Sequence, residues 1–257
     1  MRAFARLFLA VMVTGTLCAS AMAQDMTAED WYKKGQELRM NGSLDEALGA
    51  LDKATTLDPG NADAWRYKAL ALRDLQRYNE SIEAFDRAIE LGPQDMEIRL
   101  EKASVLAVVE NSSEVSEIFD MVIGQTPENR EERIMQARAW NGKGVLLEER
   151  GSYEVAMKAY DEAINLTSGE HPGSAYPSAA WLNKGNLLMK LERYNDALWA
   201  FNNATNFDPS PVTSEVWLGK GNALDALGRH TEAIEAYNRS VEAFEVDISL
   251  SPEAAKL

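Results

Sequence analysis

The sequence contains a single cysteine, Cys18, and only two histidines, His171 and His230. Cys18 lies inside an apolar N-terminal segment, so the rest of the chain has no thiol for a disulfide, a metal site or a nucleophile. The two histidines are about 60 residues apart, which is not a metal-ligand spacing. No other nucleophile has a recognisable base. We therefore expect no enzymatic activity, no metal and no cofactor.

Positive charge is also scarce. Two of the 26 basic residues lie in the N-terminal segment, and the remaining 24 stand against 41 acidic residues, a net charge of −17. Because lysine and arginine contacts to phosphates dominate the affinity for nucleic acids, this balance argues against a nucleic-acid partner. Beyond the N-terminal segment there is no long apolar run, so we expect no membrane span in the mature chain.

The first 23 residues have the form of a secretory signal peptide. Arg2 and Arg6 precede an apolar run over residues 7–17, and Ala21 and Ala23 then occupy the positions that a signal peptidase reads. The run is shorter than the ~20 apolar residues of a membrane span. We expect cleavage of residues 1–23 and an exported protein, extracellular, at the cell surface or periplasmic. The alternative is an uncleaved N-terminal membrane anchor.

The rest of the chain repeats itself. Six residues spaced by 34, 34, 41, 41 and 36 positions mark the same place of six units: Trp31, Trp65, Arg99, Trp140, Trp181 and Trp217. If each is counted as place 4, place 11 is always leucine: Leu38, Leu72, Leu106, Leu147, Leu188 and Leu224. Place 24 is always large and apolar: Leu51, Phe85, Phe119, Tyr160, Phe201 and Tyr237. The apolar places 4, 8, 11 and 20, 24, 27 are separated by three or four residues within each trio, which predicts two amphipathic helices per unit.

This pattern resembles the tetratricopeptide repeat, with its Trp…Leu-Gly…Tyr…Ala…Phe…Pro signature. The resemblance implies an all-α fold, a right-handed α-solenoid of six stacked antiparallel helix pairs. We expect the repeat domain over residues 24–247, with repeats near 28–61, 62–95, 96–129, 137–170, 178–211 and 214–247, and a short tail over 248–257. The resemblance also implies a groove, lined by the first helix of each pair, that binds a peptide segment of a partner.

Place 7 departs from the family pattern, which is usually apolar there. It is lysine in all six units: Lys34, Lys68, Lys102, Lys143, Lys184 and Lys220. Place 25 is Asp52, Asp86, Asp120, Asp161, Asn202 and Asn238. We predict contacts between these two sets, with the lysine stem packed and its amine at a carboxylate. The alternative is a cationic stripe that binds a ligand.

Other features are interpreted as scaffold or connection. The Gly-Lys-Gly tripeptides that begin at Gly142 and Gly219 lack the context of a phosphate-binding loop, and we expect them inside helices. The insertion over residues 130–136 has no Gly or Pro and is expected to lengthen the first helix of the fourth repeat by about two turns. The Pro- and Gly-containing segment 168–177 is expected to be a loop, either a connector or a contact arm.

The family geometry predicts which side chains face the groove. The candidate partner-binding residues are Tyr32, Lys33, Gln36, Arg39, Arg66, Tyr67, Leu70, Arg73, Asn183, Asn186, Met189 and Asn222. In the first two repeats they form a net positive patch with aromatic neighbours, suited to an acidic peptide, and ordinary surface variation is the alternative. The asparagines of the fifth and sixth repeats are suited to the backbone of an extended peptide.

Six Asn-x-Ser/Thr sequences are candidate glycosylation acceptors in an exported chain: Asn41, Asn79, Asn111, Asn165, Asn203 and Asn238. The last repeat lacks a full capping helix, so we expect Val241 and Phe244 to be partly exposed. The function predicted from the sequence is a protein-interaction scaffold without catalysis. The alternative is a structural module of a cell-envelope complex that self-associates through its C-terminal repeat.

Overall fold

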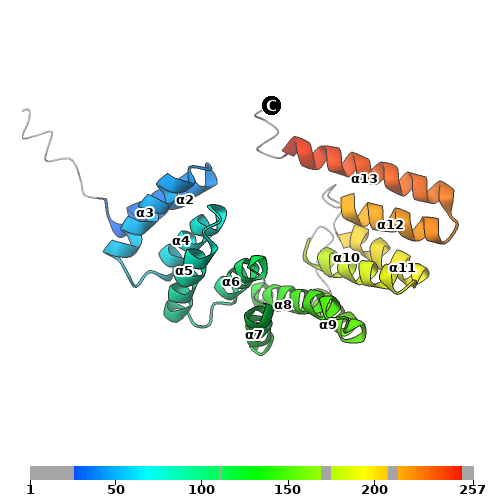
Figure 1. Cartoon of the computed structure of the whole chain (residues 1–257), viewed down its shortest axis with the longest axis horizontal. Coiled ribbons are helices and arrows are strands. Elements are labelled where there is room, and N and C mark those ends of the chain that lie inside the picture. Colours follow the sequence, from blue (N-terminus) through cyan, green and yellow to red (C-terminus); the bar gives the residue numbers. More distant parts are fainter. Residues whose placement is uncertain (1–25, 110–111, 169–174, 208–213, 251–257) are drawn as a thin grey trace, which may run out of the picture. The chain divides into compact units, whose positions relative to one another are not determined.

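The computed structural model describes residues 26–109, 112–168, 175–207 and 214–250 (Figure 1). Within these ranges every regular element is an α-helix, which confirms the all-α prediction. The helices are α2 (Ala28–Met40), α3 (Leu44–Leu57), α4 (Ala62–Asp74), α5 (Tyr78–Leu91), α6 (Met96–Val108), α7 (Ser112–Ile123), α8 (Arg130–Glu149), α9 (Tyr153–Thr167), α10 (Ala175–Lys190), α11 (Tyr194–Phe207), α12 (Ser214–Ala226) and α13 (His230–Leu250). The predicted signal segment lies outside the described residues.

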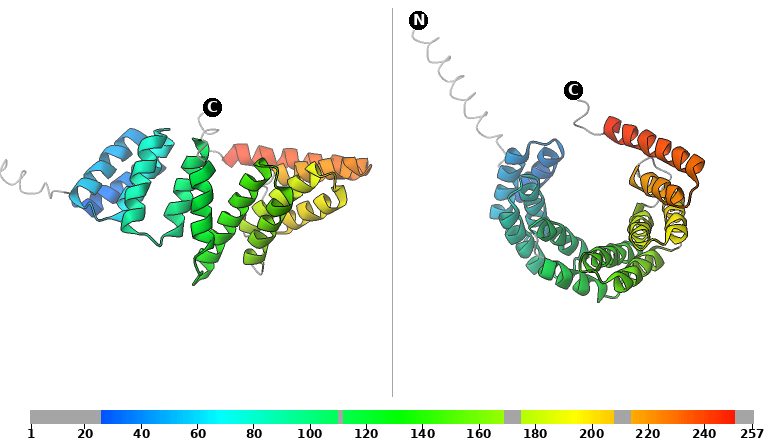
Figure 2. Two further views of the ribbon diagram at one scale, coloured as in Figure 1. Left: turned by 60° about the horizontal axis from the view of Figure 1, so that its bottom comes forward. Right: turned by 45° about the vertical axis from the view of Figure 1, so that its right-hand side comes forward.

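The helices belong to two compact units, α2 to α5 within Met1–Gln94 and α6 to α13 within Asp95–Leu257. In each unit the helices pair consecutively, α2 with α3 and so on to α12 with α13. The second helix of a pair then packs on the first helix of the next, as α3 does on α4 and α11 does on α12. The pairs of the first unit, blue to teal, can be followed in both views of Figure 2. Stacked helix pairs of this kind are the α-solenoid arrangement that the repeats predict.

Polar residues begin the first helices of the early repeats. Thr27 forms a capping box with Asp30 at the start of α2. The side chains of Asn61, Asp95 and Asn129 accept hydrogen bonds from backbone amides in the first turns of α4, α6 and α8. Each cap supplies a partner for an amide that would otherwise lack one, so these residues fix where the helices begin.

The turn between the two helices of a repeat uses a left-handed backbone at place 15. Gly42, Gly151 and Gly228 have φ angles of 78°, 74° and 75° there. Glycine adopts this conformation without steric cost. Gln76 and Glu192 hold the same place with φ angles of 60° and 58°, so the backbone is retained even where the residue is unfavourable for it.

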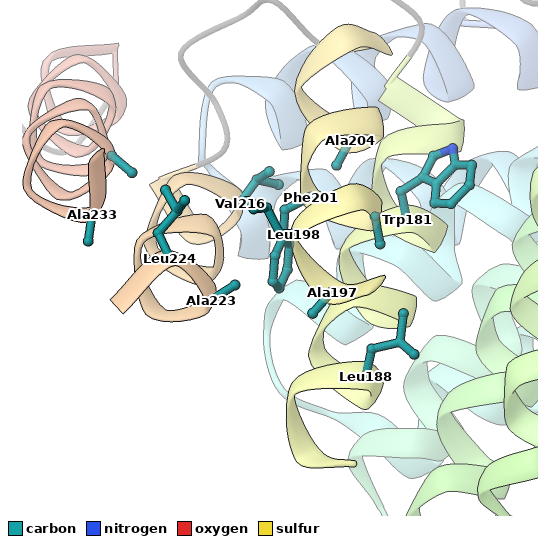
Figure 3. Close-up of a cluster of buried hydrophobic side chains, with 12 residues drawn as sticks. Trp181, Leu188, Ala197, Leu198, Phe201, Ala204, Val216, Ala223, Leu224 and Ala233 are labelled. Carbon is teal, nitrogen blue, oxygen red and sulfur yellow. The ribbon is translucent and has the colours of Figure 1, made fainter. Parts of the chain in front are cut away.

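The predicted apolar places form the core. The side chains at place 24 in repeats 1, 2, 4 and 5 are completely buried: Leu51, Phe85, Tyr160 and Phe201. Figure 3 shows the cluster of the fifth and sixth repeats, in which Trp181, Phe201, Val216 and Ala233 come from α10, α11, α12 and α13. One cluster therefore spans four helices and holds two repeats together.

The glycines of the Gly-Lys-Gly tripeptides are packing residues within helices α8 and α12, as predicted. The second glycine of each, Gly144 or Gly221, contacts the place-24 ring of its own repeat, Tyr160 or Tyr237. The first glycine of each tripeptide occupies place 6 of its repeat. A Cβ atom on Gly219 would lie 2.6 Å from the ring of Phe201 in the preceding repeat. Place 6 is therefore filled by an inter-repeat ring contact here.

Residues 130–136 lengthen α8, which has 20 residues against 13 in α2, α4 and α6, and this confirms the prediction. The last of them, Gln136, is buried. Its side-chain amide donates to the carbonyl oxygens of Val122 and Ile123 at 3.2 Å each, at the end of α7. The insertion thus tethers α8 to the preceding helix. Of the segment 168–177, residues 169–174 lie outside the described ranges, and α10 begins at Ala175.

Candidate partner-binding surface

Two first helices of the first unit, α2 and α4, bring predicted binding residues together. The rings of Tyr32 and Tyr67 meet edge to face, with their centroids 5.6 Å apart. Gln36 donates from Nε2 to the Tyr32 hydroxyl at 2.7 Å, and the Arg66 guanidinium lies 5.8 Å from the Tyr67 ring centroid. Half-buried aromatic rings beside polar and cationic groups are the kind of surface that anchors a partner.

Asp74, about two turns further along α4, holds two of the predicted arginines. Arg39 Nε lies 2.7 Å from Asp74 Oδ2, and Arg73 Nη2 lies 2.9 Å from Asp74 Oδ1. All three side chains are partly exposed. One carboxylate balances two guanidinium groups, so this part of the surface keeps an excess positive charge, and each guanidinium retains N–H donors that point away from Asp74.

Burial and neighbouring carboxylates raise the pKa of the Tyr32 hydroxyl. Desolvation, with smaller contributions from the charges of Asp63, Tyr67 and Glu29, raises the pKa of Tyr32 to about 12, against a smaller opposing effect of Arg66. The hydroxyl is therefore a neutral donor through the whole physiological pH range. It can donate to a carbonyl or carboxylate while it accepts from Gln36.

Two of the predicted binding residues in the first unit contribute less to the candidate partner-binding surface. Leu70 is only 5% exposed and belongs to the core, so the prediction that it faces a partner is wrong. A leucine gains about 1.5–3 kcal/mol from burial, which favours the core position. Lys33 is exposed, and its amine lies 3.2 Å from Glu29 one turn earlier.

The predicted residues of the second unit lie on α10 and α12. Asn183 is half-buried and donates from Nδ2 to Asn141 Oδ1 of α8 at 3.0 Å. Asn186 is exposed, and Asn222 is exposed and accepts from the Tyr237 hydroxyl at 3.0 Å. Met189 packs against the core cluster of the fifth and sixth repeats. The exposed amides of Asn186 and Asn222 thus offer donors and acceptors for a peptide backbone, whereas Asn183 already links α10 to α8.

The place-7 lysines are structural in most repeats, as predicted. Three reach the place-25 carboxylate of the preceding repeat: Lys68 to Asp52 at 2.8 Å, Lys143 to Asp120 at 2.5 Å and Lys184 to Asp161 at 2.5 Å. Lys102 instead lies 2.5 Å from Glu114. Lys34 and Lys220 lie over the tryptophans of their own repeats, Trp31 and Trp217, at 5.2 Å and 4.8 Å from a ring centroid. The alternative of a continuous cationic stripe is therefore wrong, because four of the six lysines are ion-paired within the chain.

The candidate glycosylation acceptors differ in their surroundings. Asn41 is exposed at the C-terminal end of α2, beside the turn. Asn79, Asn165 and Asn238 are exposed within helices, and the amide of Asn203 donates to the Trp199 carbonyl at 2.8 Å. Asn111 lies outside the described residues. Since acceptors are typical of surface loops, Asn41 has the most suitable position.

Within the described ranges, no group of three or more His, Cys, Asp or Glu side chains is placed to hold a metal ion. Of the helices that the structure describes, none combines the length and the apolar character needed to cross a membrane.

The stacked helix pairs, the left-handed turns and the small-on-large packing define a helical-repeat protein. A model of the tetratricopeptide repeat matches residues 32–95, 135–175 and 176–248, which is well over half of the chain. The chain therefore belongs to the tetratricopeptide repeat family, whose members are generally protein-interaction scaffolds.

Solved structures with the same fold are distant in sequence. A chain of the APC/C hetero-tetramer Cut9–Hcn1 is 17% identical with a TM-score of 0.65, over 91% of this chain and 42% of that one, so this chain spans under half of its length. PilW, described as a widely conserved type IV pilus biogenesis factor, is 16% identical with a TM-score of 0.65, over 89% and 97%. Pseudomonas aeruginosa pilF is 14% identical with a TM-score of 0.65, over 89% and 95%. These likenesses show the fold alone, and no curated protein matches the chain significantly.

Proposed function

We propose that this chain is a non-catalytic scaffold that binds an extended peptide segment of a partner protein along its first helices. The observation that carries the proposal is the surface of α2 and α4. There, two tyrosines are in edge-to-face contact with Arg66 beside one of them, and further along the same two helices Arg39 and Arg73 share the carboxylate of Asp74. Aromatic anchors next to guanidinium donors favour a peptide that brings its own carboxylates.

The proposed location is outside the cytoplasm. Its support is the basic, apolar and small-residue order of residues 1–23, together with the absence of any cysteine beyond Cys18. Of the candidate glycosylation acceptors, Asn41 lies beside a turn and is exposed, which suits an exported chain.

A self-assembling module is the second candidate, and one observation favours it. Ile234, Val241 and Phe244 of α13 are 59%, 58% and 56% exposed. This agrees with the partial exposure expected for Val241 and Phe244. An apolar face at the end of a repeat array is suited to burial against another molecule.

Charge reversal on the first-helix surface tests the first candidate. The variant changes Arg39, Arg66 and Arg73 to Glu. The matched control changes Lys53, Arg77 and Arg87 to Glu, which alters the net charge of the same unit equally at α3, at the N-cap of α5 and within α5. Partners are captured by cross-linking from the fraction that contains the native protein, and circular dichroism verifies that both variants remain folded.

We expect the first variant to lose the partners of the wild-type chain and the control to keep them. Retention of the same partners by the first variant would overturn the proposed site. Size-exclusion chromatography with light scattering addresses the second candidate, because a monomer at high concentration would rule out self-assembly.

A further inference from the structure

Two pockets in different repeats are built from equivalent residues, and neither contains a predicted groove residue. The first lies between α3, α4 and α5 and has a volume of about 430 Å³. The second lies between α11, α12 and α13 and has a volume of about 270 Å³. In both, a tryptophan at place 4 and a lysine at place 7 form the floor, and the same sequence of Arg, Glu, Glu, Ala and Arg from the second helix forms one wall. The two pockets are therefore internal duplicates.

The charges of the first pocket are balanced. Lys68 pairs with Asp52 of the preceding repeat at 2.8 Å, and Arg77 pairs with Glu80 at 2.6 Å. Arg87 pairs with Glu90 just outside the pocket. Within the lining, three basic side chains stand against the three carboxylates of Asp52, Glu80 and Glu83. The lining of this pocket therefore carries no net charge.

One substitution unbalances the second pocket. Asn202 stands where Asp52 stands in the first, so the lining has three basic side chains against the two carboxylates of Glu232 and Glu235. Arg229 keeps the equivalent partner, Glu232, at 2.6 Å. In the part of the chain that the structure describes, Lys220 has no recorded ion pair.

The remaining cations of the second pocket gather on one ring. The Lys220 amine lies 4.8 Å and the Arg239 guanidinium carbon 4.7 Å from a ring centroid of Trp217. Burial, and next the charge of Arg239, lower the pKa of Lys220; Arg229 acts in the same direction and Glu232 opposes it. Two cations held close to one indole are mutually repulsive, and an anion near both would relieve that repulsion.

We propose that the pocket between α11, α12 and α13 binds a carboxylate of a partner peptide, which takes the place that the Asp52 carboxylate fills in the first pocket, with Lys220 and Arg239 as its cationic ligands. The geometry for a carboxylate is already present three times in this chain, since Lys68, Lys143 and Lys184 each hold one at 2.5–2.8 Å. The two carboxylates of the lining disfavour a doubly charged phosphate. This site is separate from the proposed first-helix surface and does not depend on it.

The duplication supplies reciprocal swap variants for the test. The full chain, labelled with ¹⁵N and ¹³C, is titrated with short peptides while the Trp217 indole N–H and the Lys220 side-chain signals are followed by NMR. One peptide carries an internal Asp-Glu pair with blocked ends, a second has only neutral side chains and a free C-terminal carboxylate, and a third is the blocked Gln-Asn analogue. The first two arms distinguish an acidic side chain from a chain terminus as the source of the carboxylate. Inorganic phosphate is the fourth arm.

We expect at least one carboxylate peptide to shift both signals and the Gln-Asn peptide to leave them unchanged. In the Asn202→Asp variant the new side chain supplies the carboxylate that the wild-type pocket lacks. The variant should therefore bind the carboxylate peptide roughly tenfold or more weakly than the wild type. Asp52→Asn should create a second site that shifts the Trp65 and Lys68 signals. Equal binding by the wild type and the Asn202→Asp variant, binding of phosphate in preference to both peptides, or no shift with either peptide would each overturn the proposal. Both changes are isosteric, so circular dichroism should show no loss of helix.

Discussion

Gly219 of α12 packs directly against the ring of Phe201 in α11, so closely that a Cβ atom on Gly219 would lie 2.6 Å from two of the ring carbons. Gly142 has the same relationship to Phe119 two repeats earlier. Phe201 is completely buried, and its ring has no room to move aside without disturbing the cluster shown in Figure 3. In the fourth and sixth repeats, the absence of a side chain at Gly142 and Gly219 is thus a condition for their close approach to the preceding repeat.

Replacing Gly219 with alanine should destabilise the protein by about 1–3 kcal/mol, the usual result of overpacking a core. This is opposite in sign to the helix propensity, which favours alanine over glycine by ~1 kcal/mol. The measurement is urea unfolding followed by circular dichroism. Gly49→Ala is the matched control, since Gly49 is also within a helix but a Cβ atom there meets nothing within 4 Å. The control should gain about 0.5–1 kcal/mol, and a gain for both variants would contradict the packing argument.

Trp199 is 57% exposed, yet it has a defined partner. Its ring lies edge to face on Trp181 at 4.9 Å between centroids, and the Lys184 amine lies 5.2 Å from the Trp181 ring and 5.9 Å from the Trp199 ring. Trp199 holds the place that Glu83 and Glu235 hold in the two duplicate pockets. In the fifth repeat a second indole therefore stands where the pockets have a carboxylate.

Trp199→Ala should lower the free energy of unfolding by about 1 kcal/mol, because an edge-to-face pair contributes ~0.5–1.5 kcal/mol beyond its buried area. Trp199→Phe retains an edge for Trp181 and should lose less. Near-ultraviolet circular dichroism of the folded protein should report the lost tryptophan pair directly. Leu218→Ala, at a similarly exposed apolar residue, serves as the control and should change that spectrum little. Equal spectra for wild type and Trp199→Ala would refute the contact.

Tyr32 predicts an alkaline loss of stability. Its folded pKa of about 12 exceeds the value of about 10 for an unfolded chain, so the unfolded state releases the proton first as the pH rises. The stabilisation from the neutral buried hydroxyl is fully present below about pH 10 and is lost between pH 10 and pH 12. Tyr32→Phe has no proton to lose at this position. The difference in unfolding midpoint between variant and wild type, measured in urea at several pH values from 9 to 12, should therefore shift in favour of the variant. A pH-independent difference would exclude the raised pKa.

The repeat register could be predicted from the sequence because the same core contacts recur at the same place of each repeat. Leucine at place 11 and a large residue at place 24 recur in all six units, and each recurrence strengthens the same assignment. The contacts from Lys68, Lys143 and Lys184 to place 25 could be predicted for the same reason, since both sets keep one period. The fold and the ion pairs that follow the repeat period could therefore be predicted from the sequence alone.

The remaining features depend on contacts between repeats that no single period shows. Leu70 was assigned to the binding face from the family geometry, but it is buried. The partner of Gly219 could not be predicted either, because a single helix does not show that Phe201 of the preceding helix fills the space. The duplicate pockets carry a sequence signal, Arg77 with Glu80 and Arg229 with Glu232 at the same places, but only the packing of three helices turns those pairs into a wall.

The ring of Phe201 lies against Gly185 of its own repeat and Gly219 of the next, so the two repeats hold it jointly. A backbone cut between α11 and α12 would leave the Phe201 ring exposed on one fragment. The other fragment would carry the surface at Gly219 that the ring packs against. The two fragments would have complementary surfaces. The interface between the fifth and sixth repeats is therefore suited to reassembly of the protein from two separate polypeptides.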